Sequence, residues 1–390
     1  MQAQFQVLAG MSQAARRGVC FFILLALQTL SAGSVYCVSP QGDDSNSGES
    51  WQEPLDSVQS ALRRAGPGTQ VWVAAGIYQP QETRVLDASL TLATSFVLTD
   101  GVQLLGGFAG YEESPAERQR FDRDNNGVVE AWEFTHETIL QGSEDLGGTV
   151  LWGGQQDFLH AVLIDGFTIS GGRALGFAQD GQGGGALLPG NCVLQNCLLT
   201  GNLARQGGGV ALLGPSTVRN CAVVDNEVAA EGSLGCGGGV LLAAPGAVLS
   251  NSLVQGNCRL LRGACRGGGG VAGTAGTAVK YCTIVENYAE GDGAGICFSE
   301  AAAQLHSSVI WGNVGPGAQI RLGGAQCRHC AVQDCSAAAG ILPLAAENCG
   351  ANGVAVNDNT IAALYPCFRD PARGDYRLGA GSYLINRGRG

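Results

Sequence analysis

The hydrophobic and polar positions of this chain repeat in the same order at intervals of 22 to 31 residues. Each period has one aliphatic position, a Cys, Ser or Phe three residues later, and a second aliphatic position five residues after the first. The middle positions are Phe167, Cys197, Cys221, Ser252, Cys282, Ser308 and Cys330. A repeat of this length with one short strand per period is typical of a solenoid, in which each coil contacts only its neighbours.

Polar turn residues keep the register of the aliphatic positions. Asparagine follows the second aliphatic position by three residues in five consecutive periods, at Asn202, Asn226, Asn257, Asn287 and Asn313. Glycine runs precede a second family of strands, such as GGGALL and GGGVLL, and they allow the backbone to bend sharply. Matching columns favour a solenoid over an all-β sandwich, whose strands would recur every ~8–12 residues without such columns.

The pattern divides the chain into five segments. They are a signal peptide (1–33), an N-terminal cap with the first coils (34–110), a charged insertion (111–137), the repeats (138–335), and C-terminal coils with a terminal module (336–390). In the cap, Leu55, Val58 and Leu62 lie on one face of an expected helix that ends at Gly66. Such a helix would cover the open end of the solenoid.

The first 33 residues have the features of a secretory signal. Arg16 and Arg17 precede an apolar run over residues 19–30, and small residues at 31–33 suit cleavage. The run is too short to span a bilayer, and no later run of ~18 apolar residues follows. We therefore expect a secreted or extracellular protein without a transmembrane segment in the mature chain.

Composition supports the solenoid and disfavours some classes of binding partner. Glycine provides 62 of the 390 residues, and charged residues make up only 14% of the chain. The net charge is −11, and it becomes −13 without the two arginines of the signal. An acidic balance disfavours nucleic acid and anionic membranes as partners, and it is compatible with cation binding.

Cysteine is frequent, with 15 residues in the chain and 14 once Cys20 is removed with the signal. An even number in an oxidising compartment allows disulfides. Cys236–Cys265 is the first candidate pair, because both residues precede glycine runs of consecutive coils, and Cys258–Cys265 is the alternative. The cysteines of the central column can simply pack as small apolar residues.

Residues 122–133, DRDNNGVVEAWE, match the calcium loop of an EF-hand. Such a loop wraps one ion in hard oxygen ligands at fixed positions, with glycine at the sharp turn. The expected ligands are Asp122, Asp124, Asn126, the backbone carbonyl of Val128, Glu130 through water, and Glu133 as a bidentate carboxylate. Short helices are expected on both sides, and a single loop is expected to bind calcium weakly, in a structural role. The alternative is a solvated acidic loop.

Three stretches carry a family resemblance. VSPQGDDSNSGESWQEP begins at residue 38, GVQLLGGFAGYEES at residue 101, and PCFRDPARGDYRLGAGSYLINRG at residue 366. Together with the coils they resemble right-handed parallel β-helix proteins of the pectate-lyase-like superfamily, of the bacterial secreted or cell-surface type. The last stretch resembles a choice-of-anchor module. The resemblance implies fold and secretion, but little about activity, because the superfamily includes lyases, hydrolases and adhesins.

The resemblance also directs attention to possible catalytic residues. Lyases of this superfamily use a basic residue to remove a proton next to a uronate carboxylate, with calcium to acidify it. Lys280 or Arg219 would be that base, with Asp225 or Glu286 nearby. Both bases belong to an outward column of Asp165, Gln195, Arg219, Ser250, Lys280 and His306. A solvated strand face is the favoured interpretation of this column.

The sequence thus predicts an all-β right-handed parallel β-helix with a capping helix and a calcium-loop insertion. The favoured function is a non-catalytic glycan-binding or adhesin-like scaffold, with polysaccharide or cell-surface glycan as partner. One alternative is a calcium-assisted polysaccharide lyase or glycoside hydrolase that acts on acidic polysaccharide. Another is a structural component of a surface coat.

Overall fold

The computed structural model describes residues 33–85, 92–154, 156–176, 178–229, 237–258, 265, 267–328, 330–333, 368–373 and 375–379. Apart from Gly33, the expected signal peptide lies outside these residues. All described residues from Val35 onward belong to one compact unit. No helix among the described residues is both long and apolar enough to cross a membrane.

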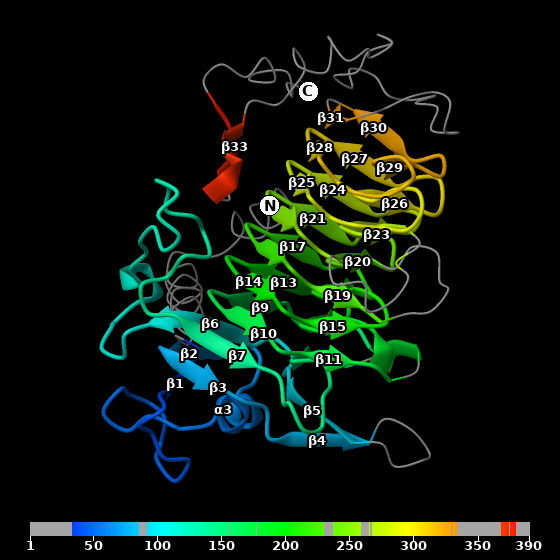
Figure 1. The fold of residues 1–390 in the computed structure, drawn as a ribbon. Helices are drawn as coiled ribbons and strands as arrows, with labels where there is room; N and C mark the ends of the chain where they lie inside the picture. The colour runs from blue at the N-terminus through cyan, green and yellow to red at the C-terminus, as the bar shows by residue number, and fades with distance from the viewer. Residues whose placement is uncertain are drawn as a thin grey trace, which may run out of the picture. The chain divides into compact units, whose positions relative to one another are not determined.

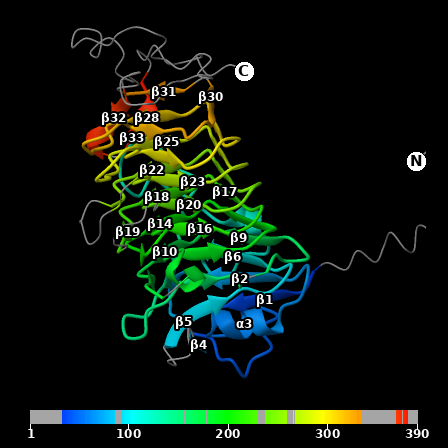
Figure 2. The same ribbon diagram turned by 90° about the vertical axis from the view of Figure 1, so that its right-hand side faces the viewer.

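Short parallel strands stack into three sheets around one core, as Figures 1 and 2 show. The first sheet contains β1 (Val35–Val38), β2 (Gln70–Ala74), β6 (Gln103–Phe108), β9 (Val162–Asp165), β13 (Cys192–Gln195), β17 (Thr217–Arg219), β21 (Val248–Ser250), β24 (Ala278–Lys280), β27 (Gln304–His306) and β30 (Gln326–Arg328). The second contains β3 (Gly76–Tyr78), β7 (Thr138–Gln141), β10 (Thr168–Ser170), β14 (Leu198–Thr200), β18 (Ala222–Val224), β22 (Leu253–Gln255), β25 (Thr283–Val285), β28 (Val309–Trp311) and β31 (Ala331–Val332).

The third sheet faces the other two and begins with the one antiparallel pair among its described strands, β4 and β5. It contains β4 (Glu82–Val85), β5 (Leu92–Val97), β8 (Leu151–Trp152), β12 (Ala186–Leu188), β16 (Val210–Leu212), β20 (Val240–Leu242), β23 (Val271–Gly273), β26 (Ile296–Phe298) and β29 (Ile320–Arg321). Three shorter strands pair beside it: β11 (Arg173–Ala174), β15 (Leu203–Ala204) and β19 (Glu227–Val228). The fold is a right-handed parallel β-helix, as the sequence predicts.

The strand register confirms the aliphatic columns. Leu194 pairs with Val218, Val218 with Leu249, and Leu249 with Val279. All four side chains are fully buried in the common core. Burial of such a column along every coil supplies the hydrophobic stabilisation of the β-helix.

Buried asparagines form a continuous hydrogen-bonded stack at the turn after the second sheet. The side-chain amide of Asn226 donates to the Asn257 oxygen (3.1 Å), and the amide of Asn257 donates to the Asn287 oxygen (2.8 Å). The amide of Asn257 also donates to the backbone carbonyl of Val223 (3.0 Å). The stack therefore satisfies polar groups in the interior that would otherwise cost free energy. This confirms the expected asparagine column.

Glycine is required where the next turn crosses the asparagine stack. A Cβ added to Gly209 would lie 2.7 Å from the Gly239 carbonyl oxygen and 2.7 Å from Cγ1 of Val223. Any side chain here would push neighbouring coils apart, which explains the glycine runs before the third sheet.

The expected capping helix is α3 (Val58–Arg64). It is shorter than the segment from Leu55 to Gly66 over which the sequence pattern predicts it. The Ser57 side chain accepts a hydrogen bond from the Ser60 N–H, which caps the first turn. Val58 and Leu62 are buried against the first coils. The helix ends at Arg64 because Ala65 already has extended backbone.

The cysteines of the central column pack as small apolar residues. Cys197, Cys221 and Cys282 are buried in the core. Burial raises the pKa of Cys282 to about 12, so its thiol is protonated at neutral pH. Cys258 has a free thiol in the structure, so the alternative Cys258–Cys265 pairing is not formed. Cys236, needed for the first candidate pair, lies outside the described residues.

The expected terminal module at 336–390 is described only at 368–373 and 375–379. There, β32 (Phe368–Asp370) and β33 (Asp375–Leu378) form an antiparallel hairpin. Phe368 and Tyr376 pack in a small cluster with Val285, Trp311 and Leu253 on the outer face of the second sheet. The Gln255 amide also donates to the Tyr376 hydroxyl (2.9 Å). The hairpin is thus attached to the flank of the coils.

Candidate functional site

The insertion is held on the first sheet by one buried arginine. Arg118 donates to the Gly106 carbonyl (2.8 Å) and pairs with Asp165 of β9 (3.3 Å). Its guanidinium also lies 4.9 Å from the centre of the Phe134 ring. The prediction that Asp165 lies on a solvated strand face was wrong, because Arg118 from the insertion covers it and leaves it only 5% exposed.

The loop at 122–133 lacks the two flanking helices expected from the EF-hand pattern. A single turn of 3-10 helix, η1 (Pro115–Glu117), precedes it, and no helix is present between the loop and β7. Instead, Arg120 and Phe134 form an antiparallel bridge that closes the loop at its base. Because β7 begins at Thr138, too few residues follow Glu133 to form a helix.

Backbone N–H groups inside the loop are directed at its carboxylates. Asp122 accepts hydrogen bonds from the N–H groups of Asn126 (3.0 Å) and Gly127 (2.7 Å). Glu133 accepts from Arg123 (2.9 Å) and Glu130 (2.9 Å). Gly127 has a φ of 88°, which favours glycine at the sharp turn. The loop therefore forms its turn with the acidic side chains facing inward.

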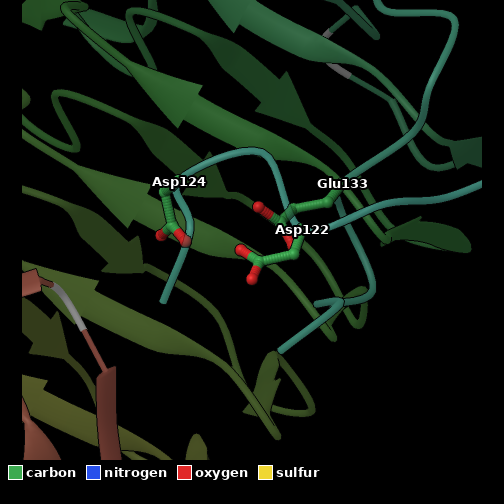
Figure 3. A group of neighbouring side chains, drawn as sticks. All are labelled: Asp122, Asp124 and Glu133. Atoms are coloured by element: carbon green, nitrogen blue, oxygen red, sulfur yellow. The ribbon is translucent and has the colours of Figure 1, made fainter. Parts of the chain in front are cut away.

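Three carboxylates converge in this loop (Figure 3). One oxygen each from Asp122, Asp124 and Glu133 lies within 4.8 Å of the others. Glu133 is only 4% exposed, so the cluster has one buried wall. Like charges at this separation repel, and a bound cation would relieve the repulsion.

The pKa values of the loop carboxyls reflect this crowding. Burial, and next the neighbouring Glu133, raise the pKa of Glu130 to about 7. Burial and the charges of Glu133 and Asp122 also raise the pKa of Asp124, against a hydrogen bond from Asn126. Oε2 of Glu130 is buried and has no hydrogen-bond partner among the described residues. These observations fit a hard cation held by oxygen ligands.

A groove with a volume of about 660 Å³ lies against this loop. One wall is the loop itself, with Asp124, Trp132 and Glu133. The floor is the outer face of the second sheet from β14 to β25, with the turns that precede it. The opposite wall is the hairpin strand β33. The polar and aromatic lining includes Arg123, Asn126, Glu130, Asn220, Asn251, Gln255, Tyr281, Asp375, Tyr376 and Arg377.

The four catalytic candidates do not line this groove. Lys280 and Arg219 end strands of the first sheet, whereas Asp225 and Glu286 follow strands of the second sheet. A complete strand and a turn therefore separate each base from the carboxylate of its own coil. The two bases thus lie on the first sheet, and the two carboxylates lie on the turn after the second sheet.

The hairpin wall of the groove was missed by the sequence analysis. Asp375, Tyr376 and Arg377 lie more than 240 residues away from Asp124 in the chain. Arg377 donates to the Asp375 carboxylate (2.7 Å), and Asp375 is buried. A close ion-pair partner two residues away on one strand was the available signal, because strand alternation places both side chains on one face.

Comparison with known proteins supports the fold. Residues 148–337 match the family model described as right handed beta helix region. No curated protein matches this chain.

Several solved structures are similar in fold. Pectate lyase Pel9A is 15% identical, with 77% of this chain and 70% of that chain covered and a TM-score of 0.47. A rhamnogalacturonan lyase is 14% identical, with 76% and 73% covered and a TM-score of 0.46. A lacto-N-biosidase from Eubacterium ramulus is 12% identical, with 75% and 62% covered and a TM-score of 0.41.

Proposed function

We propose that this protein is a secreted or cell-surface scaffold that binds a glycan in the groove beside the loop at 122–133. The observation that carries the proposal is the lining of the groove, which combines aromatic rings with amide and charged side chains. Sugar rings present apolar faces and a rim of hydroxyl groups, so they suit such a surface. A volume of about 660 Å³ is large enough for a short stretch of polysaccharide.

Calcium is the proposed resident ion of the loop. Asp122, Asp124 and Glu133 would hold it with their carboxylates, together with Asn126, Glu130 and the Val128 carbonyl. A bound ion would neutralise the crowded carboxylates and fix the wall of the groove. The role is structural, since the loop is single and has no flanking helices to move.

A non-catalytic role is proposed because the candidate base and acid residues do not meet in the groove. Lys280 and Arg219 point from the first sheet, and the groove lies over the second. The lyase or hydrolase alternative would need a base and an acid on opposite sides of one bound sugar.

The test is binding of the purified mature protein to a panel of immobilised plant and bacterial polysaccharides, with calcium and with chelator. Tyr281→Ala removes an aromatic ring of the groove, and Tyr111→Ala removes an exposed ring outside it, as the control. We expect Tyr281→Ala alone to weaken binding. Equal binding by both variants, or no polysaccharide bound, would contradict the proposal. Ultraviolet-absorbing unsaturated products would instead identify a lyase.

A further inference from the structure

A column of basic side chains runs along the outer face of the first sheet. Arg219, Lys280 and Arg328 are the last residues of β17, β24 and β30. Strand pairing places Ser250 between Arg219 and Lys280, and His306 between Lys280 and Arg328. We call these five residues the basic ladder; its strands are labelled in Figure 1.

The ladder side chains point away from the core. Their chain neighbours Val218, Val279 and Cys327 are buried, and alternation along a strand sends the next side chain outward. Arg219 and Arg328 are exposed, and Lys280 is half-buried. The ladder is therefore open to solvent.

No ion pair to Arg219, Lys280 or Arg328 is found in the part of the chain that the structure describes. Arg219 donates to the amide oxygen of Gln195 (2.8 and 2.6 Å). The outward positions two residues earlier on the same strands are also uncharged: Thr217, Val248, Ala278, Gln304 and Gln326. This cationic stripe lies on a chain of net charge −11 that contains one lysine.

The arginine and lysine side chains of the ladder lie on every second strand of the sheet. Rungs of a parallel sheet are ~4.8 Å apart, so Arg219, Lys280 and Arg328 recur about every 9.6 Å. That distance is close to the length of one disaccharide in an extended β-linked polysaccharide. It is much longer than the ~3.4 Å of helix axis per phosphate of one DNA strand, and the negative net charge of the chain also repels nucleic acid.

We propose that the basic ladder binds a linear polysaccharide in which an acidic sugar alternates with an uncharged one. The chain would lie along the axis of the coils, and one carboxylate of each disaccharide would face one ladder cation. Exposed charge pairs are individually weak, and a repeating array makes them additive along the polymer.

The ladder is a separate surface that borders the proposed groove. Asn220, Asn251 and Tyr281 line the groove, and each directly follows a ladder residue in the chain. The proposal goes beyond the groove function, because it requires neither the loop carboxylates nor calcium. The two sites can therefore be tested separately.

The experiment measures binding of the full mature protein to hyaluronan, an alternating uronate polymer, in a buffer with chelator. The comparison polymer is carboxyl-reduced hyaluronan, which has the same backbone without charge. The test variant is Arg219→Gln/Lys280→Gln/Arg328→Gln. The control variant, Arg63→Gln/Arg205→Gln/Arg321→Gln, makes the same charge change at exposed sites outside the ladder.

We expect hyaluronan binding that weakens as salt is added and that falls about tenfold in the ladder variant. The control variant should stay within about twofold of the parent protein. Circular dichroism verifies that both variants are folded, and Lys280→Arg, which keeps the charge, should bind hyaluronan as the parent protein does.

Three results would overturn the proposal: no binding to hyaluronan by the parent protein, equal binding to the carboxyl-reduced polymer, or equal losses in the two triple variants. Loss of groove binding in Trp132→Ala, a substitution in the loop wall of the groove, with unchanged hyaluronan binding would support two independent sites. Failure of the groove test alone leaves the ladder result intact.

Discussion

At the scale of single residues, the chain uses carboxyl and amide groups in two opposite ways. Glu133 is buried with like charges, an arrangement that favours a bound cation. Asn257 is buried with hydrogen bonds to the Val223 carbonyl and to the asparagine amides of the adjacent coils. The first arrangement points to a cation site, and the second stabilises the fold.

Replacement of Glu133 by Gln tests the proposed calcium site. The substitution removes one charge and the bidentate carboxylate, so we expect calcium affinity to fall on the order of tenfold or more. Isothermal titration calorimetry with calcium measures the change. Glu113→Gln, an exposed position in the same insertion, is the control and should keep the parent affinity. Unchanged affinity in Glu133→Gln would rule out this carboxylate as a ligand.

Replacement of Asn257 by Ala tests the asparagine stack. The variant removes the acceptor of the buried Asn226 backbone N–H (3.0 Å), and it takes one hydrogen bond each from the Val223 carbonyl and the side-chain amides of Asn226 and Asn287. We expect the free energy of unfolding to fall by about 3 kcal/mol, since each buried unsatisfied group costs ~1–3 kcal/mol. Urea denaturation followed by circular dichroism measures it. Gln304→Ala, on an exposed strand position, should change the stability little.

At the scale of elements, the coils follow the sequence pattern and the insertion does not. Inward positions such as Leu249 and Val279 could be predicted because a repeated column needs only its period. The burial of Asp165 could not, because it depends on Arg118 from a segment outside the repeat. The groove could not be predicted either, since its walls come from the insertion and the C-terminal hairpin. The position of its floor depends on which coils these two segments reach.

Glu112 fixes the start of the insertion and makes it sensitive to acid. Burial raises the pKa of Glu112, but hydrogen bonds from the N–H groups of Ala109, Gly110 and Tyr111 outweigh it and lower the pKa below 4.5. A lowered pKa means that its stabilisation is complete above pH 4.5 and is lost as the pH falls through the folded-state value.

Replacement of Glu112 by Gln should therefore lower the free energy of unfolding by about 1–2 kcal/mol at neutral pH, since bonds to a charged acceptor are lost. The difference from the parent protein should shrink as the pH is lowered below 4.5. Urea unfolding at neutral and acidic pH measures it, with Glu113→Gln as the exposed control. A difference that is constant with pH would contradict this role of the carboxylate.

At the scale of the whole molecule, stability is distributed along the coils. Each described coil from β9 onward pairs only with the coil before it and the coil after it. In such an array the free energy of unfolding is approximately the sum of the intrinsic stability of each coil and the interaction between adjacent coils. A destabilising substitution in one coil therefore affects mainly that coil and its neighbours. The helix α3 and its contacts with β1, β2 and β5 stabilise the first coils independently of the later ones.

Leu249→Ala tests how far along the coils a local destabilisation spreads. Leu249 is fully buried in β21, between β17 and β24, and its truncation should cost about 2–5 kcal/mol. We expect hydrogen exchange measured by mass spectrometry to accelerate in β17, β21 and β24, because these strands share the defect. Exchange in α3 and β1 should stay at the parent rate, because several intact coils separate them from it. Equal acceleration from α3 to β30 would instead show that the β-helix unfolds as one cooperative unit, and the loop at 122–133 and the basic ladder would then unfold together.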